Sequence, residues 1–294
     1  MQKSNARIIT AEEIAAYGRY LQNEEKGRST QEYYLRTARR LMEWLGGQTV
    51  EKAATIAYKE SLKARGYKTG SINTMLAAMN SFLRFLGWED CRVKSLREQA
   101  QDCDTKGREL QREDFERLVD AAEAAENRRL ALLLNAMSAT GMRVSELKFI
   151  TVEAALLGMT VVTLKGKSRH VVLSGGISTM LLKYAEEQGI ETGPIFITRT
   201  GRPMSRTNIW REMKALSVRA KVPEHKVFPH NLRHYFARAF YNLNHDIVKL
   251  SVMLGHSSID TTRRYIKSTI AEFREQLDRM DMVYSGKMRE KKTA

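Results

Sequence analysis

The sequence is poor in cysteine and proline and has no long apolar run. Only two of its 294 residues are cysteine and four are proline. Cys91 and Cys103 lack metal-ligand spacing, so we expect free thiols in a reducing compartment. No segment approaches the ~18 apolar residues of a membrane span, and the N-terminal MQKSNARIITAEE lacks the apolar core of a signal peptide. These absences predict a cytoplasmic protein with no membrane association.

Basic residues clearly outnumber acidic ones. The chain has 49 Lys and Arg against 34 Asp and Glu, a formal net charge of +15, and +11 of this excess lies after residue 104. A charge excess is often only a solvated face, but one of this size favours a polyanionic partner, most commonly nucleic acid. An anionic membrane is the weaker alternative, because no basic helix with exposed Trp, Phe or Leu stands out.

The first hundred residues have the pattern of a small helical bundle. Thr10-x-x-Glu13 and Ser29-x-x-Glu32 each fit a capping box at a helix start. The clearest apolar stripe runs over residues 72–86 and ends at Gly87. We therefore predict a small helical domain over residues 1–95, followed by a polar linker over 96–107.

Residues 108–294 predict a second domain, mostly helical with a small β-sheet. MTVVTLKGKSRHVVLS (159–174) places two β-branched runs around a Lys-Gly-Lys-Ser turn, which indicates a hairpin. GPIFIT (193–198) is a candidate for a further short strand. The predicted fold class is mainly α, with a helical N-terminal domain and an α-rich second domain carrying a small antiparallel sheet.

Two stretches of this second domain combine arginine with other polar residues near helix ends. In ATGMRVSEL (139–147), Gly141 is expected to cap one helix, and Arg143 and Glu146 to open the next. In FPHNLRHYFARAF (228–240), Pro229 suits a first helical turn, so His230 and Arg233 share one face near a helix N-terminus, where phosphate is favoured. The alternative for each arginine is a solvated side chain. His234 is expected to be a structural hydrogen-bonding residue.

A third stretch, LGHSSIDTTRRYI (254–266), places His256 nine residues before Tyr265. This spacing alone does not distinguish an ordinary helix start with a surface tyrosine from a nucleophile with its supporting histidine. The order of all the motifs along the chain is more informative than any one of them.

In that order, ATGMRVSEL, LKGKSRHVVL, HNLRH and LGHSSIDTTRRYI resemble the motifs of the tyrosine recombinase, or phage integrase, family. The resemblance covers about 125 residues, and the helical N-terminal module fits the family's core-binding domain in a two-domain Xer- or Cre-like layout. It implies a site-specific DNA recombinase that cuts and rejoins double-stranded DNA through a covalent 3′-phosphotyrosyl intermediate. Type IB topoisomerase-like nicking and closing, and non-catalytic DNA-binding regulation, are the alternatives. A histidine-based metallohydrolase is more distant, since HNLRH is not H-E-x-x-H.

The resemblance also assigns roles to the motif residues. Tyr265 is the expected nucleophile, and an unperturbed phenol with a pKa near ~10 needs an acceptor such as His230 for its proton. Arg143 and Arg233 suit stabilisation of the charged phosphorane, because a guanidinium binds phosphate in a fork and stays charged. Lys165 aligns best as the acid for the leaving 5′-oxygen, and Lys167 is the alternative. His256 is expected to donate a hydrogen bond to the phosphate, and Glu146 to orient its neighbours. No carboxylate cluster or Gly-rich phosphate loop is found in the sequence, so we expect neither metal nor ATP nor any other cofactor.

The C-terminal segment has a narrow apolar stripe over residues 266–284, followed by a basic tail. A helix packed on its own domain is one interpretation. The other, which the resemblance implies, is a helix that docks on the next protomer of a homotetramer on DNA.

Overall fold

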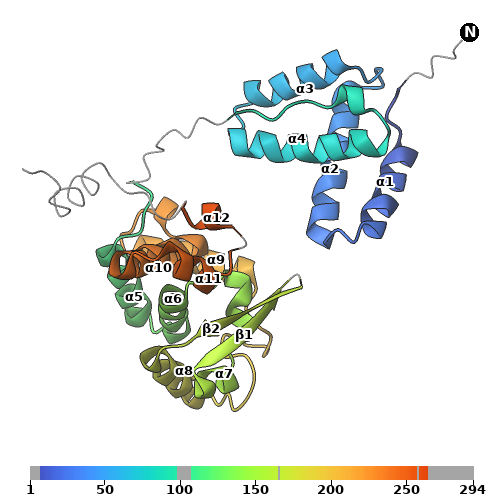
Figure 1. Ribbon diagram of the computed structural model, residues 1–294. Coiled ribbons are helices and arrows are strands. Elements are labelled where there is room, and N and C mark those ends of the chain that lie inside the picture. The colour runs from blue at the N-terminus through green and yellow to red at the C-terminus, as the bar shows by residue number, and fades with distance from the viewer. Residues whose placement is uncertain (1–6, 98–106, 165, 257, 264–294) are drawn as a thin grey trace, which may run out of the picture. The chain divides into compact units, whose positions relative to one another are not determined.

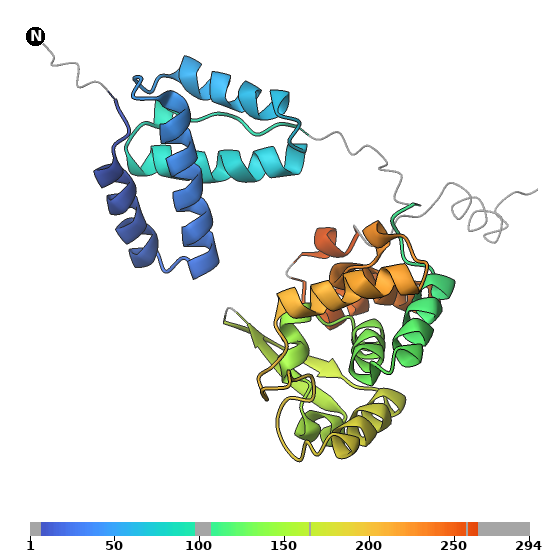
Figure 2. The same cartoon turned by 180° about the vertical axis from the view of Figure 1, so that it is seen from behind.

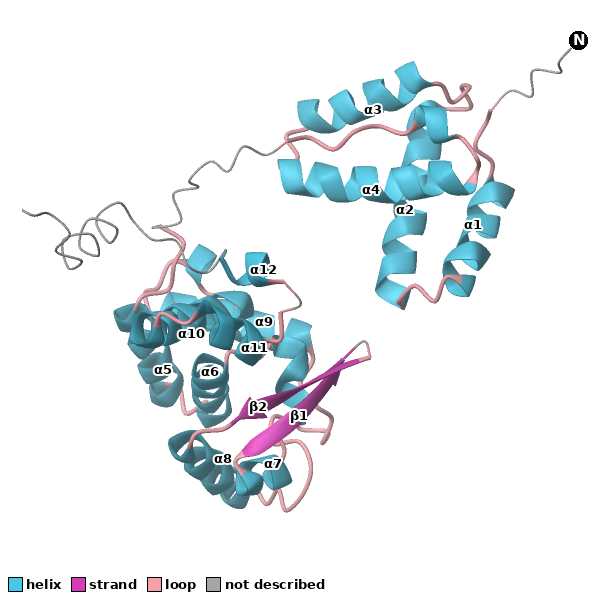
Figure 3. Cartoon of the chain, in the orientation of Figure 1, coloured by secondary structure: helices cyan, strands magenta, loops and turns pink. Residues whose placement is uncertain are grey.

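The computed structural model describes residues 7–97, 107–164, 166–256 and 258–263 (Figure 1). The chain divides into two compact units, residues 1–103 and 104–294. Helices dominate both units, and the one sheet among the described residues has two antiparallel strands (Figure 3). The predicted mainly α fold class with a small antiparallel sheet is confirmed. Within the described ranges, no helix has the length and apolar character to cross a membrane.

The first unit is a small helical bundle. Its buried core includes Tyr17, Leu41, Leu76 and Phe82, and α2 packs against both α1 and α4. The predicted small helical bundle is thus present. The elements are α1 (Ala11–Asn23), α2 (Arg28–Leu45), α3 (Lys52–Ala64), α4 (Thr69–Phe85) and the 3₁₀ turn η1 (Glu89–Cys91).

One of the two predicted capping boxes is confirmed and the other is wrong. At α1 the main-chain nitrogen of Glu13 donates to the Thr10 hydroxyl at 3.3 Å, and the main-chain nitrogen of Thr10 donates to the Glu13 carboxylate at 2.9 Å. At α2 the N-cap is Gly27, with no side-chain cap. Ser29 therefore lies inside the first turn, where its hydroxyl cannot cap, and Glu32 accepts from Arg28 at 3.1 Å instead.

The second unit packs helices around the buried helix α6. Leu130, Leu133 and Met137 of α6 are in its core, and α5, α8 and α10 all contact this helix. The elements are α5 (Arg112–Ala124), α6 (Arg128–Thr140), the 3₁₀ helix η2 (Val144–Phe149), α7 (Val152–Leu157), β1 (Met159–Leu164), β2 (Lys167–Val172), α8 (Gly175–Glu187), α9 (Arg206–Arg219), the 3₁₀ turn η3 (Glu224–Lys226), α10 (Pro229–Asn244), α11 (Ile247–Leu254) and α12 (Ile259–Arg263).

The hairpin of β1 and β2 forms as predicted, with Met159 opposite Val172 and Leu164 opposite Lys167. In both views it runs along the edge of the helical body (Figures 1 and 2). Strand β1 contacts η2 and strand β2 contacts α11, so the hairpin lies beside the segments that carry the arginine and histidine motifs. The strand expected over residues 193–198 was wrong. That segment makes only two isolated bridges, Pro194 with Thr151 and Ile197 with Pro203. Each pair includes a proline, which has no N–H with which to extend a ladder.

Some predicted features fall outside the described residues. These are the C-terminal helix over 266–284 and most of the linker over 96–107. They stay predictions.

Candidate active site

A pocket of about 410 Å³ in the second unit brings together three of the residues singled out in the sequence. Its wall includes Arg143 from the turn between α6 and η2, together with His230 and Arg233 from the start of α10. Arg143 and Arg233 are 90 residues apart in the sequence, so only the packing of α10 against α6 explains their meeting. The pocket therefore concentrates positive charge and imidazole in one place.

Two further residues of α9, Arg206 and Trp210, line the same pocket. Trp210 is 49% exposed, and the Lys214 ammonium lies 5.6 Å from the centre of its ring. The sequence analysis missed both residues. The only available signal was their place on an amphipathic helix with several basic residues.

Arg143 is positioned by the way α6 ends. Gly141 is the left-handed C-cap of α6, with φ +62°, as the sequence predicted. The chain then turns, and Arg143 becomes the N-cap of η2. Its side chain is 40% exposed and donates from Nη1 to the Glu146 carboxylate at 2.9 Å. Arg143 is thus held at one end while part of its guanidinium faces the pocket.

Glu146 is a buried carboxylate that organises two arginines. Its side chain is 1% exposed and also accepts from the Arg143 main-chain nitrogen at 2.8 Å and from Arg169 Nη2 at 2.6 Å. Burial alone would raise the pKa of Glu146, but the hydrogen bonds from Arg143 and the charge of Arg169 outweigh it and lower the pKa. Glu146 is therefore ionised at neutral pH, and its geometry agrees with the expectation that it orients its neighbours.

Arg233 is buried, with 1% of its surface exposed, so the alternative of a solvated arginine is wrong. Pro229 is the first residue of α10, as predicted, and one turn later Arg233 points back toward the end of α6. Its Nη1 donates to the Gly141 carbonyl and its Nη2 to the Leu254 carbonyl, both at 2.7 Å. These two contacts are to neutral carbonyl groups, so they fix the guanidinium without neutralising its charge.

His256 accepts a further hydrogen bond from the buried Arg233. Arg233 Nη2 lies 2.9 Å from His256 Nε2, and because a guanidinium only donates, Nε2 accepts. The other ring nitrogen, Nδ1, then carries the proton and donates to the Thr262 hydroxyl at 2.8 Å. Burial, followed by the charges of Arg233 and Arg143, lowers the pKa of His256 to about 4. In this arrangement the neutral imidazole supports Arg233, and a hydrogen bond from His256 to a phosphate stays a prediction.

His230 and His234 stand one turn apart on α10, with their ring centres 4.8 Å apart and edge to face. Loss of water around the ring, followed by the charges of Arg233, Arg143 and Arg206, lowers the pKa of His230. Burial and the neighbouring His230 lower the pKa of His234 to about 3. Both imidazoles are therefore neutral at pH 7, and His230, which lines the pocket, has the protonation state that an acceptor needs.

Two predicted residues, Lys165 and Tyr265, lie outside the described residues. Lys167 is the first residue of β2, and its main chain is described. The structure places the hairpin and the loop of His256 next to the pocket residues, but the roles of Lys165 and Tyr265 stay predictions. No group of three or more His, Cys, Asp or Glu with metal-binding geometry is found in the described ranges.

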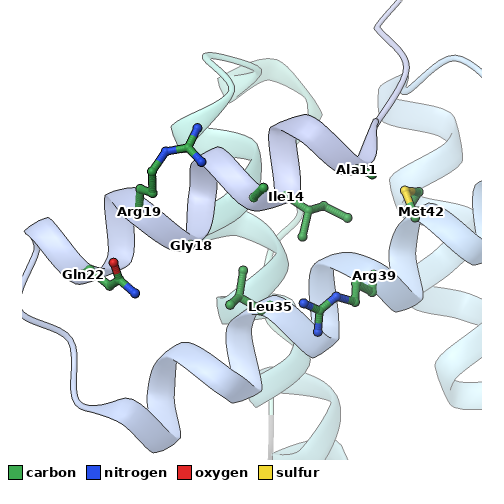
Figure 4. Close-up of a pocket in the computed structure, with 9 residues that line it drawn as sticks. Ala11, Ile14, Gly18, Arg19, Gln22, Leu35, Arg39 and Met42 are labelled. Atoms are coloured by element: carbon green, nitrogen blue, oxygen red, sulfur yellow. The ribbon is translucent and has the colours of Figure 1, made fainter.

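A second groove of about 410 Å³ lies between α1 and α2 of the first unit (Figure 4). Ile14 and Leu35 point into the space between the helices, and Arg19 and Arg39 lie at its edges. The groove contains no carboxylate, imidazole or nucleophile in its lining. The pocket of Arg143 and Arg233 combines guanidinium groups with an imidazole, so we assign the chemistry to it.

Comparison with known proteins gives matches in both units. Residues 108–272 match the Phage integrase family, and residues 14–90 match its N-terminal SAM-like domain. The chain is 27% identical over 280 residues to tyrosine recombinase XerA of Thermococcus kodakarensis, covering 92% of this chain and 96% of that protein. It is also 27% identical over 294 residues to tyrosine recombinase XerD of Halalkalibacterium halodurans, covering 92% and 91%.

Solved structures share the fold. The Tn1549 transposon integrase in complex with transposon right end DNA matches with a TM-score of 0.72 at 16% identity, covering 91% of this chain and 99% of that chain. The XerH recombinase bound to difH substrate, in a pre-cleavage complex, matches with a TM-score of 0.68 at 17% identity, covering 92% and 84%. These likenesses concern architecture, whereas the catalytic-domain match spans more than half of the sequence. The chain therefore belongs to the phage integrase family of tyrosine recombinases.

Proposed function

We propose that this protein is a site-specific recombinase of double-stranded DNA in which Tyr265 is the nucleophile. The tyrosine oxygen attacks the scissile phosphorus, and the bond from phosphorus to the 5′-oxygen breaks as the 3′-phosphotyrosyl bond forms. A 5′-hydroxyl of the partner strand then reverses the chemistry and releases the tyrosine. The observation that carries the proposal is the pocket that gathers Arg143, His230 and Arg233 from distant segments.

The two arginines supply the electrostatic part of catalysis. Attack on a phosphodiester adds negative charge to the non-bridging oxygens, which fixed guanidinium groups stabilise without reorganisation. Arg233 is held in place by carbonyl groups and His256, while Arg143 is partly exposed beside it in the pocket wall. Loss of one such donor typically slows catalysis about 100- to 1000-fold.

Two proton transfers accompany the exchange. His230 is neutral at working pH because its pKa is lowered, so it accepts the phenolic proton of Tyr265. A lysine of the hairpin, Lys165 in our assignment, donates a proton to the leaving 5′-oxygen. The arginines supply the cationic charge, and the phosphotyrosyl bond conserves the energy of the broken linkage, so we propose that the reaction requires neither metal nor ATP.

The proposed assembly is a homotetramer in the cytoplasm that holds two DNA sites. Each exchange joins strands from two duplexes, which requires more than one active site in one complex. The apolar stripe of residues 266–284 is our candidate for the segment that links neighbouring protomers. Integration, excision, resolution and inversion all use this same chemistry.

The test is covalent trapping on a nicked duplex built from the DNA that flanks the gene. The short fragment beyond the nick diffuses away before resealing, so wild-type protein should accumulate as a protein–DNA adduct, in EDTA as in its absence. Tyr265→Phe removes only the hydroxyl, and should bind DNA normally but give no adduct. An adduct that persists in Tyr265→Phe and maps to another residue would overturn the assignment. Relaxation of a plasmid without paired sites would instead favour a nicking and closing enzyme.

A further inference from the structure

Arg169, on strand β2, was not among the residues singled out in the sequence, yet it contacts two segments of the site. Its side chain is 12% exposed. Nη2 donates to the Glu146 carboxylate at 2.6 Å, and Nη1 donates to the Met253 carbonyl, near the end of α11. One guanidinium thus joins the hairpin to the Arg143 turn and to the loop that carries His256.

Glu146 is shared between Arg169 and Arg143. One carboxylate oxygen accepts from Arg143 Nη1, and the other from the Arg143 main chain and Arg169 Nη2. With both arginines present, the single negative charge of buried Glu146 is shared between two positive charges. Without Arg169, the carboxylate would pair with Arg143 alone, which would draw the Arg143 guanidinium away from a phosphate and cancel more of its charge.

The path of the Arg169 side chain depends on Gly255, which immediately precedes His256. Gly255 has φ +64°, a left-handed conformation that favours glycine. A Cβ at Gly255 would collide with Arg169 Cδ and lie 2.9 Å from its Nε. The absence of a side chain at Gly255 therefore allows the Arg169 side chain to lie against the backbone of the His256 loop.

We propose that Arg169 is a positioning residue that sets the geometry and effective charge of Arg143 through Glu146, while it braces the His256 loop through Met253 and Gly255. This inference rests on the proposed function, because its effect appears in the rate of phosphotyrosyl formation. Arg169 acts on Arg143 indirectly, through Glu146, and requires no contact with the substrate. Its removal is expected to lower the cleavage rate and to spare DNA affinity.

The test compares Arg169→Gln and Arg169→Lys with wild type in single-turnover adduct formation on the nicked duplex. Arg169→Gln keeps a hydrogen-bond donor without the charge, and we expect a fall in rate of about 10- to 100-fold, typical of the loss of a supporting partner or a small misplacement. Arg169→Lys keeps the charge but not the fork, so part of the rate should return. DNA affinity should stay close to wild type, and both variants should remain folded at the assay temperature although loss of a buried ion-pair partner lowers the thermal midpoint.

Arg117→Gln is the matched control. Asp114 is buried and, like Glu146, is shared by two cations, accepting from Arg117 at 2.6 Å and from Lys226 at 2.9 Å. None of these three residues lines the pocket of Arg143. Arg117→Gln should therefore leave the rate of adduct formation unchanged.

A substrate with a neutral methylphosphonate at the scissile position tests whether Arg169 affects cleavage through the charge of Arg143. This substrate lacks one phosphate charge and depends less on the arginines, so the defect of Arg169→Gln should shrink on it, as should that of Arg143→Ala. The double variant Arg143→Ala/Arg169→Gln should be slower than Arg143→Ala by less than the factor that Arg169→Gln costs in the wild-type background, because the route through Arg143 is already lost and only the brace on the His256 loop remains.

Three results would overturn the proposal: a wild-type rate in Arg169→Gln, a defect that methylphosphonate does not reduce, or loss of the fold in both Arg169 variants, which would make the residue purely structural. Absence of an adduct with wild-type protein would instead count against the proposed function itself.

Discussion

At the scale of single residues, the two site arginines are held in different ways. Arg233 is buried and fixed by carbonyl groups and a neutral imidazole, so its position is set before any substrate arrives. Arg143 is partly exposed and tied to an ionised carboxylate. Arg233 therefore provides the preorganised charge, whereas the charge that Arg143 presents depends on how Glu146 is shared.

Gly141 contributes directly to this preorganisation. It has φ +62°, its carbonyl accepts from Arg233, and a Cβ there would collide with the Phe236 ring, with Cε1 at 2.9 Å. Gly141→Ala should lower the free energy of unfolding by about 2–5 kcal/mol, combining ~1–2 kcal/mol for the left-handed backbone with ~1–3 kcal/mol for overpacking. Urea denaturation of the purified wild-type and variant proteins measures this difference in the free energy of unfolding.

Gly158→Ala is the matched control for that prediction. Gly158 is also a left-handed helix C-cap of the second unit, but a Cβ there meets only the Leu173 carbonyl, at 3.8 Å. Gly158→Ala should lower the free energy of unfolding only by the strain of the left-handed backbone, about 1–2 kcal/mol. Equal losses in the two variants would show that Phe236 moves aside freely, contrary to the packing argument.

The sequence predicted residues whose motifs are local and missed one whose role depends on long-range contacts. The left-handed cap at Gly141 and the position of Pro229 at a helix start follow from neighbouring residues, and both were predicted. Arg169 was missed because its partners, Glu146 and Met253, are 23 and 84 residues away. Strand alternation alone does not indicate which buried group a charged side chain will meet.

At the scale of elements, the hairpin carries the candidate lysines and packs beside the segments that form the pocket. Contacts of β1 with η2 and of β2 with α11 place it against both sides of the site. The hairpin was predictable because β-branched runs around a Gly turn are a strong local signal. The missed cap of α2 and the wrongly predicted strand over 193–198 show the opposite case, in which a two-residue shift or a proline changed the outcome.

The two hairpin lysines can be distinguished by leaving-group chemistry. A 5′-bridging phosphorothiolate releases a thiolate, which needs no proton from the enzyme because a thiol has a pKa near ~8.5. Lys165→Ala should therefore be slow on ordinary DNA and close to wild type on the phosphorothiolate, measured as adduct formation in a single turnover. Rescue confined to Lys167→Ala would move the acid by two residues.

At the scale of the whole molecule, the chain combines a helical unit with an α-rich unit that carries the pocket. Each unit has its own buried core. The positive excess that the sequence showed is present in both units, and most of it lies in the second. The mainly α class could be predicted because helical periodicity is local, whereas no pattern in the sequence fixes how subunits would assemble.

Truncation after Lys267 tests the proposed assembly. It keeps Tyr265 and Ile266 and removes the rest of the apolar stripe, residues 268–284. We expect single-site DNA binding to persist, because the two folded units remain, and multi-subunit complexes on paired sites to disappear in sedimentation velocity runs. A truncated chain that fails to fold, judged by circular dichroism, would show instead that the segment packs on its own subunit.

The half-exposed indole in the pocket wall gives the protein an intrinsic optical signal. Trp210 is the single tryptophan after residue 104, since the other two are Trp44 and Trp88. We expect its emission to respond to a ligand beside Arg143, because Trp210 lines the same pocket, and to local charge, because the Lys214 ammonium lies near its ring. With Trp44 and Trp88 replaced by phenylalanine, stopped-flow fluorescence would follow filling and emptying of the pocket in unlabelled protein, separately from bond cleavage.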